Sequence, residues 1–188
     1  MLWIDDKIFT KLTKEYFIFL EEKYDMSIQS IENAECIRYI SNVTWLEVWY
    51  DKYSLFIEMG TNDGFNKTTL WDILQFVDRK GLVSSYMASD ETTLRKGMQL
   101  LSDYVKLYCN KALIGDTEFY KEVKESKENH EKKDALKNKL NYIEELAKAA
   151  WVKQDYNEVI NIYEPILEHL SPMQNKRLNI CYRRRETG

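Results

Sequence analysis

The chain has 188 residues, of which 44% are hydrophobic and 31% charged, and its formal net charge is −4. This length and composition fit one globular domain with a small appendage and exclude a disordered chain. The mild negative charge gives no electrostatic basis for binding nucleic acid, so we expect no nucleic-acid partner.

The N-terminal stretch MLWIDDKIFT has neither the basic start nor the apolar stretch of a signal peptide. No segment approaches the roughly 18 apolar residues that a membrane span needs. Three cysteines, at positions 36, 109 and 181, are far apart and show no CxxC spacing, which argues against disulfides and against a zinc site. We therefore expect a soluble, cytoplasmic protein that contacts no membrane.

The first predicted element is a helix from about Asp6 to Lys23, with Asp5 or Asp6 as its cap. Between Cys36 and Gly60 the apolar period changes to two, and the segments CIRYI, TWLEVWY and SLFIEMG predict three β-strands. Only helices are expected after them, so the predicted fold class is α+β: an N-terminal helix, a three-stranded antiparallel meander, then helices.

Two turns, at Asn42–Val43 and Lys52–Tyr53, set the register of this meander. Both turns independently place the same set of apolar side chains on one face, and a one-residue slip would invert every side chain. The set expected to face the helices is Ile37, Tyr39, Leu46, Val48, Tyr50, Leu55, Ile57 and Met59.

The opposite face of the meander mixes aromatic and charged side chains. It can be covered by another helix, or it can be partly open and bind a protein through aromatic anchors ringed by charge. The candidate partner-binding residues on it are Arg38, Trp45, Glu47, Trp49, Phe56 and Glu58.

No catalytic residues, metal ligands or cofactor-binding residues are predicted. His130 and His169 lack a second histidine at metal-ligand spacing, and no glycine-rich phosphate loop is present. Glu47 and Glu58 face each other and could share a proton, but Arg38 in the same row would neutralise one of them, which favours a charge ladder. We expect a protein that is not an enzyme.

The predicted organisation is an α+β body over residues 1–120, a charged helix or linker over 121–135, and a helical tail over 136–188. Within the tail, the segment LAKAAWVKQDYNEVINIYEPILEHLSP resembles one tetratricopeptide (TPR) repeat, a helix–turn–helix unit. It departs from the pattern at Gln154, where a glycine is usual, at Val159, where an alanine is usual, and in a proline that comes one residue late. The residues that lie near the pattern positions are Leu146, Ala147, Tyr156, Val159, Tyr163, Ile166 and Pro172. We expect Tyr156–Leu170 to form the second helix of the hairpin and to pack Val159, Tyr163 and Ile166 against Leu146, Ala147 and Ala150.

The whole chain resembles small bacterial proteins that are encoded beside polymorphic toxins and act as immunity proteins. The resemblance rests on FLEEKY, on LEVWYD followed by SLFIEMG, on LWDIL, on LSDYVKLYCNKALIGD with Phe119 after it, and on YNEVINIYEPILEHLSPMQNKRLNI. It implies a protein that binds and blocks a toxin and has no chemistry of its own.

The expected function is therefore the binding and neutralisation of a bacterial toxin. The expected partner is a protein, in particular a basic toxin domain, and the expected state is a monomer or weak homodimer. Two alternatives remain open: a TPR-type scaffold or adaptor that uses the C-terminal hairpin, and an enzyme with a carboxylate site at Glu47 and Glu58.

Overall fold

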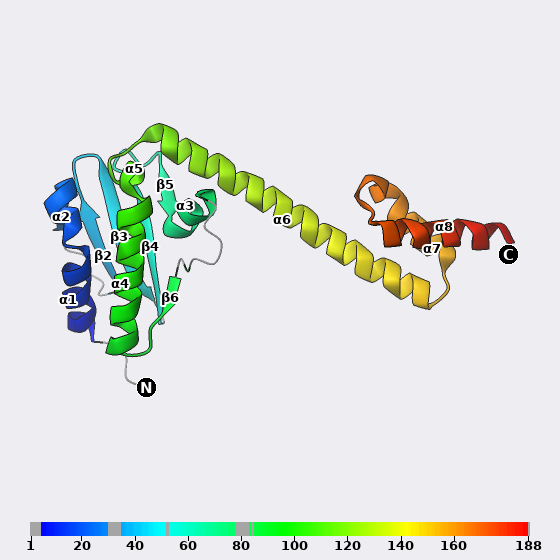
Figure 1. Ribbon diagram of the computed structural model, residues 1–188, viewed down its shortest axis with the longest axis horizontal. Helices are drawn as coiled ribbons and strands as arrows, with labels where there is room; N and C mark the ends of the chain where they lie inside the picture. Colours follow the sequence, from blue (N-terminus) through cyan, green and yellow to red (C-terminus); the bar gives the residue numbers. More distant parts are fainter. Residues whose placement is uncertain (1–4, 30–34, 52, 78–82, 84, 188) are drawn as a thin grey trace. The chain divides into compact units, whose positions relative to one another are not determined.

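The computed structural model describes residues 5–29, 35–51, 53–77, 83 and 85–187. The chain divides into two compact units, which we call the N-terminal unit (Met1–Glu128) and the C-terminal unit (Asn129–Gly188). Helix α6 (Thr117–Val152) contributes residues to both units (Figure 1). The fold class is α+β, as predicted.

The N-terminal unit is built on an antiparallel sheet, to which six strands contribute among the described residues. The strands pair in the order β1-β2-β3-β4-β5, and β6 pairs with the part of β4 that β5 leaves free. Their bounds are β1 (Ser27–Gln29), β2 (Cys36–Ile40), β3 (Thr44–Asp51), β4 (Ser54–Thr61), β5 (Lys67–Thr69) and β6 (Ser85–Met87).

The predicted register of the meander is confirmed at every pair. Leu46 lies opposite both Tyr39 and Met59, and Val48 lies opposite both Ile37 and Ile57. The turn before β4 places Tyr53 at φ 79, while Lys52 lies outside the described residues.

The prediction of three strands followed only by helices is wrong. The structure adds β1 before the meander and β5 and β6 after it. Each of these strands has only three residues, and a segment this short cannot display a period of two. Their pairing is decided by the long strands beside which they lie.

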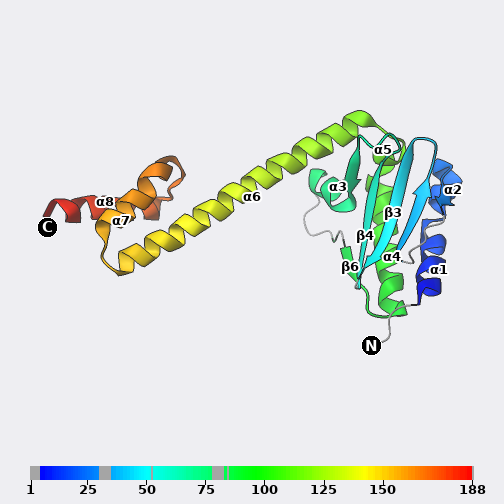
Figure 2. The same ribbon diagram turned by 180° about the vertical axis from the view of Figure 1, so that it is seen from behind.

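Helices cover one face of the sheet, and Figures 1 and 2 show α1 and α4 lying across it from opposite viewpoints. The helix starts are specified locally, because Asp5 accepts a hydrogen bond from the Lys7 amide and Asp90 forms a capping box with Thr93. The helices are α1 (Asp6–Phe17), α2 (Phe19–Tyr24), α3 (Leu70–Phe76), α4 (Glu91–Tyr108) and α5 (Asn110–Leu113).

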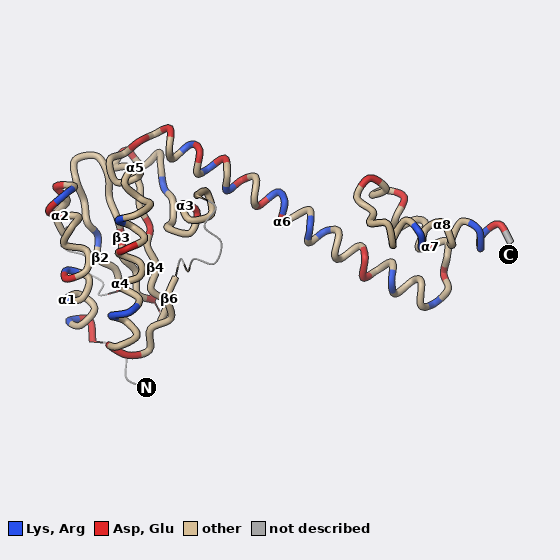
Figure 3. The backbone as a smooth tube through the Cα atoms, viewed as in Figure 1, with Lys and Arg blue, Asp and Glu red and all other residues tan. Residues whose placement is uncertain are grey.

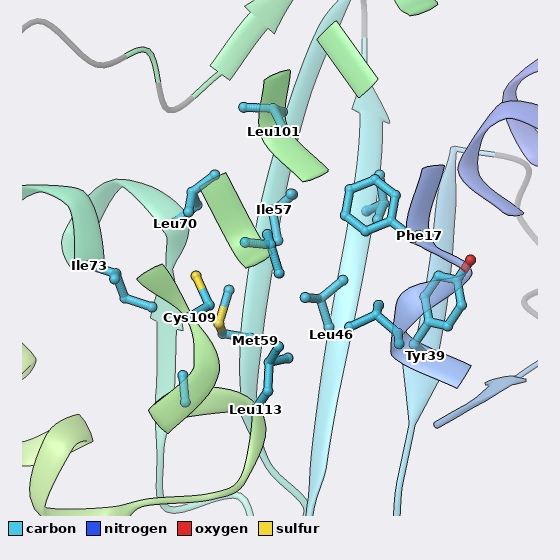
Figure 4. Packing of buried hydrophobic residues seen from close by; sticks show 14 of the residues in the cluster. Phe17, Tyr39, Leu46, Ile57, Met59, Leu70, Ile73, Leu101, Cys109 and Leu113 are labelled. Atoms are coloured by element: carbon cyan, nitrogen blue, oxygen red, sulfur yellow. The ribbon is translucent and has the colours of Figure 1, made fainter. Parts of the chain in front are cut away.

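The core lies between the sheet and these helices (Figure 4). Leu46 and Met59 from the strands, Leu101 from α4 and Phe17 from α1 are all fully buried there. The helix α5 and the start of α6 extend the core through Cys109, Leu113 and Phe119. The face of the meander that the sequence assigns to the helices is therefore the core face.

The C-terminal unit has its own small core, formed by the end of α6, α7 (Tyr156–Tyr163), the 3₁₀ helix η1 (Glu164–His169) and α8 (Pro172–Thr187). The turn between α6 and α7 places Gln154 at φ 59. The side chains buried in this core are Ala147, Ala150, Val159, Ile160, Tyr163, Ile166, Leu178 and Cys181.

Two expectations about this tail are wrong. An uninterrupted helix from Tyr156 to Leu170 is predicted, but the α-helix ends at Tyr163 and the next turns are 3₁₀ with a kink at Ile166. Pro165 explains the change, because proline has no amide hydrogen to donate to the preceding turn. Leu146, expected to pack against α7, is 43% exposed.

The charged stretch from Lys121 to Asp134 is helical, since α6 continues through it without interruption. Charges of both signs alternate along this part of α6 (Figure 3). The unit boundary at Glu128 lies inside this stretch. Among the residues described, no helix is long and apolar enough to cross a membrane.

Candidate functional site

The sheet has a second face, which we call the open face. The described helices of the N-terminal unit pack on the other side, so that in Figure 2 the strands lie in front of α4. Three rows of paired residues cross the open face: Ile40–Trp45–Gly60–Lys67, Arg38–Glu47–Glu58–Thr69, and Cys36–Trp49–Phe56–Ser85. The register therefore brings all six predicted partner-binding residues onto one surface.

Each carboxylate of the middle row has a cation of its own. Glu47 accepts a hydrogen bond of 2.7 Å from Nε of Arg38, and Glu58 lies 2.8 Å from Nζ of Lys67. Glu47 also accepts a bond of 3.0 Å from the indole nitrogen of Trp49, and its side chain is only 7% exposed. The row is a closed set of paired charges and leaves no carboxylate unpartnered.

The aromatic side chains beside this row pack against one another and against their neighbours. Trp49 and Phe56 stack with ring centroids 6.0 Å apart and planes inclined by 3°. The Trp45 ring lies over Gly60, where an added Cβ would come within 2.7 Å of the ring. The guanidinium of Arg38 is 5.2 Å from the centre of the Trp45 ring, a cation–π contact. These rings are half-buried and packed against their neighbours, so they should lose little side-chain freedom when a partner covers them.

Cys36 lies at the end of the aromatic row and is only 4% exposed. Burial, together with the charge of Glu47, raises the pKa of its thiol to about 12, despite the opposing charge of Arg38. Such a thiol stays protonated at neutral pH and is a poor nucleophile.

Two side chains on the open face are not predicted from the sequence. Lys67 reaches it on β5, and Met87, which is 69% exposed, reaches it on β6 opposite Ser54. Both side chains belong to strands of three residues that the sequence pattern does not reveal. A cation two residues before a helix cap at Thr69 carries no signal of its own.

The geometry favours binding over acid–base chemistry at this surface. Two carboxylates share a proton when no cation neutralises them, whereas Glu47 and Glu58 are each paired with a cationic side chain. Within the described ranges, no group of three or more His, Cys, Asp or Glu side chains is arranged to hold a metal ion. His130 lies in the exposed middle of α6, and His169 lies at the end of η1 beside Glu168.

Comparisons of the chain with protein-family models, curated proteins and solved structures find no match.

Proposed function

We propose that the chain is a protein-binding protein whose partner covers the open face. One observation carries this proposal: a sheet face that carries Trp45, Trp49 and Phe56 has no described helix of its own unit on it. Aromatic side chains anchored among charges that are already paired are typical of binding hot spots. A partner that covers this face gains aromatic contact area without having to neutralise Glu47 or Glu58 itself.

The partner that we propose is a bacterial toxin, which the chain neutralises in the cytoplasm. The resemblance to immunity proteins supports this choice, and the charge of the N-terminal unit supports a basic toxin domain. That unit carries 22 acidic and 16 basic side chains. A net negative surface accelerates association with a basic partner.

Co-expression tests the proposal. The chain is expressed together with any toxin gene that neighbours its own gene, and growth of the host cells is measured. We expect the chain to restore growth, and a mixture of purified proteins to form a complex. Absence of a neighbouring toxin gene, or unrelieved toxicity, would count against neutralisation as the function.

Substitution of Trp49 locates the interface. Trp49→Ala should weaken toxin binding by about 2 kcal/mol or more, because binding energy concentrates in a few aromatic anchors. The matched control is Trp71→Ala, since Trp71 is 48% exposed on α3 and lies outside the open face. Calorimetric titration measures the toxin affinity of both folded variants. Equal affinities would show that the interface lies elsewhere than on the open face.

A second candidate function, a scaffold or adaptor, rests on the C-terminal unit. The small Ala147 is fully buried where α6 meets Val159 and Tyr163 of α7, as a TPR-like hairpin requires. We propose that α6 and α7 form such a hairpin and that α8 takes the place of the first helix of a next repeat. Toxin binding that survives Trp49→Ala but is lost on removal of residues 153–188 would favour this candidate.

A further inference from the structure

Helix α8 buries one side and exposes the other. On the buried side, Leu178 is only 2% exposed and lies in the core of the C-terminal unit. Successive residues of an α-helix are about 100° apart around its axis, so the position of Leu178 fixes which residues point away from the core. We call the outer face of α8 a set of four exposed residues that project within about 40° of the opposite direction: Met173, Lys176, Ile180 and Arg183.

The outer face alternates apolar and cationic side chains. Its positions are separated by three, four and three residues, which is the spacing of a helix side that packs along another helix. Met173 and Ile180 are 68% and 36% exposed, whereas Lys176 and Arg183 carry positive charge. Glu186, the one acidic residue in the sequence of α8, projects about 100° away from the centre of this face. The outer face therefore combines a narrow apolar strip with positive charge.

This combination selects the chemistry of a partner. Carboxylates complement Lys176 and Arg183, and apolar side chains complement Met173 and Ile180. A nucleic acid would supply phosphates for the two cations, but its phosphate backbone offers no apolar surface to the other two side chains. A lipid bilayer holds a helix through the apolar area that the helix buries, and two apolar side chains bury little. A protein segment that presents both carboxylates and apolar side chains complements all four residues.

We propose that the outer face of α8 binds an acidic amphipathic helix of a partner protein. The end of α6, α7 and α8 follow one another along the chain and pack in one core. In a stack of such helices, the exposed side of each helix accepts the next one. A partner helix in that place would set its apolar and acidic residues, alternating at intervals of three and four, against the outer face. This binding deepens the scaffold function proposed above, on which it rests, and does not involve the open face.

A designed peptide tests the proposal without any toxin. The probe is a fluorescein-labelled helical peptide of about 21 residues, with leucine at the first and glutamate at the fourth position of each heptad. Alanine and glutamine fill the other positions, and a matched peptide has lysine in place of glutamate. Fluorescence anisotropy with the full chain at about 50 mM salt should give a dissociation constant below about 100 µM for the acidic peptide. The basic peptide should bind at least about tenfold more weakly.

Charge reversal on the outer face should exchange the two preferences. Lys176→Glu combined with Arg183→Glu should weaken binding of the acidic peptide at least about tenfold and strengthen binding of the basic peptide. Lys137→Glu combined with Lys139→Glu is the matched control, because it makes the same change of charge at exposed positions of α6. The control should change the affinity for the acidic peptide by less than about threefold.

Removal of the apolar strip should also weaken binding. Met173→Ser combined with Ile180→Ser should reduce the affinity for the acidic peptide by about three- to tenfold, because the variant buries less apolar area. A contact made by charge alone would leave that affinity unchanged and would overturn the amphipathic part of the proposal. Circular dichroism checks that each variant keeps its helices.

Several other results would overturn the proposal. The wild-type chain could bind the basic peptide as tightly as the acidic one, or the charge reversals on α8 and on α6 could reduce affinity equally. Tighter binding to vesicles that contain phosphatidylserine, or to a single-stranded RNA, would assign the cations to another class of partner. Loss of toxin binding on removal of residues 153–188, without any binding of the acidic peptide, would keep the scaffold function and exclude the outer face of α8 as its site.

Discussion

The two units bury apolar surface in different ways. Among the residues that the structure describes, the core of the N-terminal unit collects 26 buried side chains from a sheet and from helices that are distant in sequence. The core of the C-terminal unit collects eight, from helices that follow one another along the chain. The larger core can hold a half-exposed aromatic face beside it, whereas the smaller one relies on polar contacts between its helices. We therefore expect the N-terminal unit to have the larger free energy of unfolding, and the C-terminal unit to depend more on contacts between neighbouring helices.

Truncation of one core residue in each unit tests most directly whether the two cores are independent. Leu46→Ala and Leu178→Ala each remove a buried leucine, and each should cost about 2–5 kcal/mol. Because the cores are separate, Leu46→Ala should accelerate hydrogen exchange across the strands, and Leu178→Ala only in α7 and α8. Exchange measured by mass spectrometry checks this, and equal acceleration in both units would show that they unfold together.

A larger side chain in the small core of the C-terminal unit should destabilise that unit. Ala147 is fully buried between α6 and α7, so Ala147→Leu should destabilise the C-terminal unit by about 1–3 kcal/mol. Ala149→Leu adds the same volume at an exposed position of the same helix and should change stability by less than about 0.5 kcal/mol. Thermal unfolding of both variants provides the measurement; an unchanged melting temperature for Ala147→Leu would reject the hairpin packing.

The polar cluster around Glu144 should make the C-terminal unit sensitive to acid. Burial alone would raise the pKa of Glu144, but hydrogen bonds from Tyr163, Gln174 and Arg177 hold the pKa below its ordinary value of 4.5. A carboxyl with a lowered folded-state pKa stabilises the fold above its unfolded-state value and loses that contribution as the pH falls through the folded-state value. Stability of the C-terminal unit should therefore decrease as the pH falls below 4.5.

Glu144→Gln removes this charge and should cost about 1–3 kcal/mol at neutral pH. Its stability should also vary less than that of the wild type below pH 4.5. Urea unfolding of the C-terminal unit at several pH values measures the stability of the wild type and of Glu144→Gln. Parallel pH profiles for the wild type and Glu144→Gln would mean that the cluster contributes no acid sensitivity.

The smallest expected effect concerns the turn between α6 and α7. Gln154 adopts φ 59, a left-handed conformation that costs a residue with a Cβ about 1 kcal/mol. Gln154→Gly should relieve this strain and stabilise the C-terminal unit by up to about 1 kcal/mol, whereas Gln154→Ala should not. Chemical unfolding compares the two variants, and a gain with alanine would point to the loss of the glutamine side chain as the cause.

Much of the N-terminal unit follows from sequence pattern. Alternation in β2, β3 and β4 specifies which side chains face the helices, and every predicted pair, such as Val48 with Ile57, is found. The six predicted site residues share a face for the same reason. The sequence could not predict that no helix covers this face. A strand with Trp49 and Glu47 on one side has the same sequence pattern whether or not a helix packs on that side.

The sequence pattern could not predict the short strands or the break in the tail helix. Strands β5 and β6 have three residues each, so the positions of Lys67 and Met87 on the open face depend on pairing with β4. In the tail, the break after Tyr163 has a local cause at Pro165, yet a proline can also kink a helix without changing its type. Leu146 matches the repeat pattern but lies outside the core.

The sequence by itself determined the fold class, the register of the meander and the start of α1, because alternation, periodicity and capping act between residues that are close along the chain. The tertiary structure alone decided which sheet face the helices cover, which cation pairs with Glu58, and which flank of α6 stays exposed. These outcomes depend on contacts between residues that are far apart along the chain, such as Lys127 of α6 with Asp72 of α3 at 3.3 Å, and no local pattern encodes them.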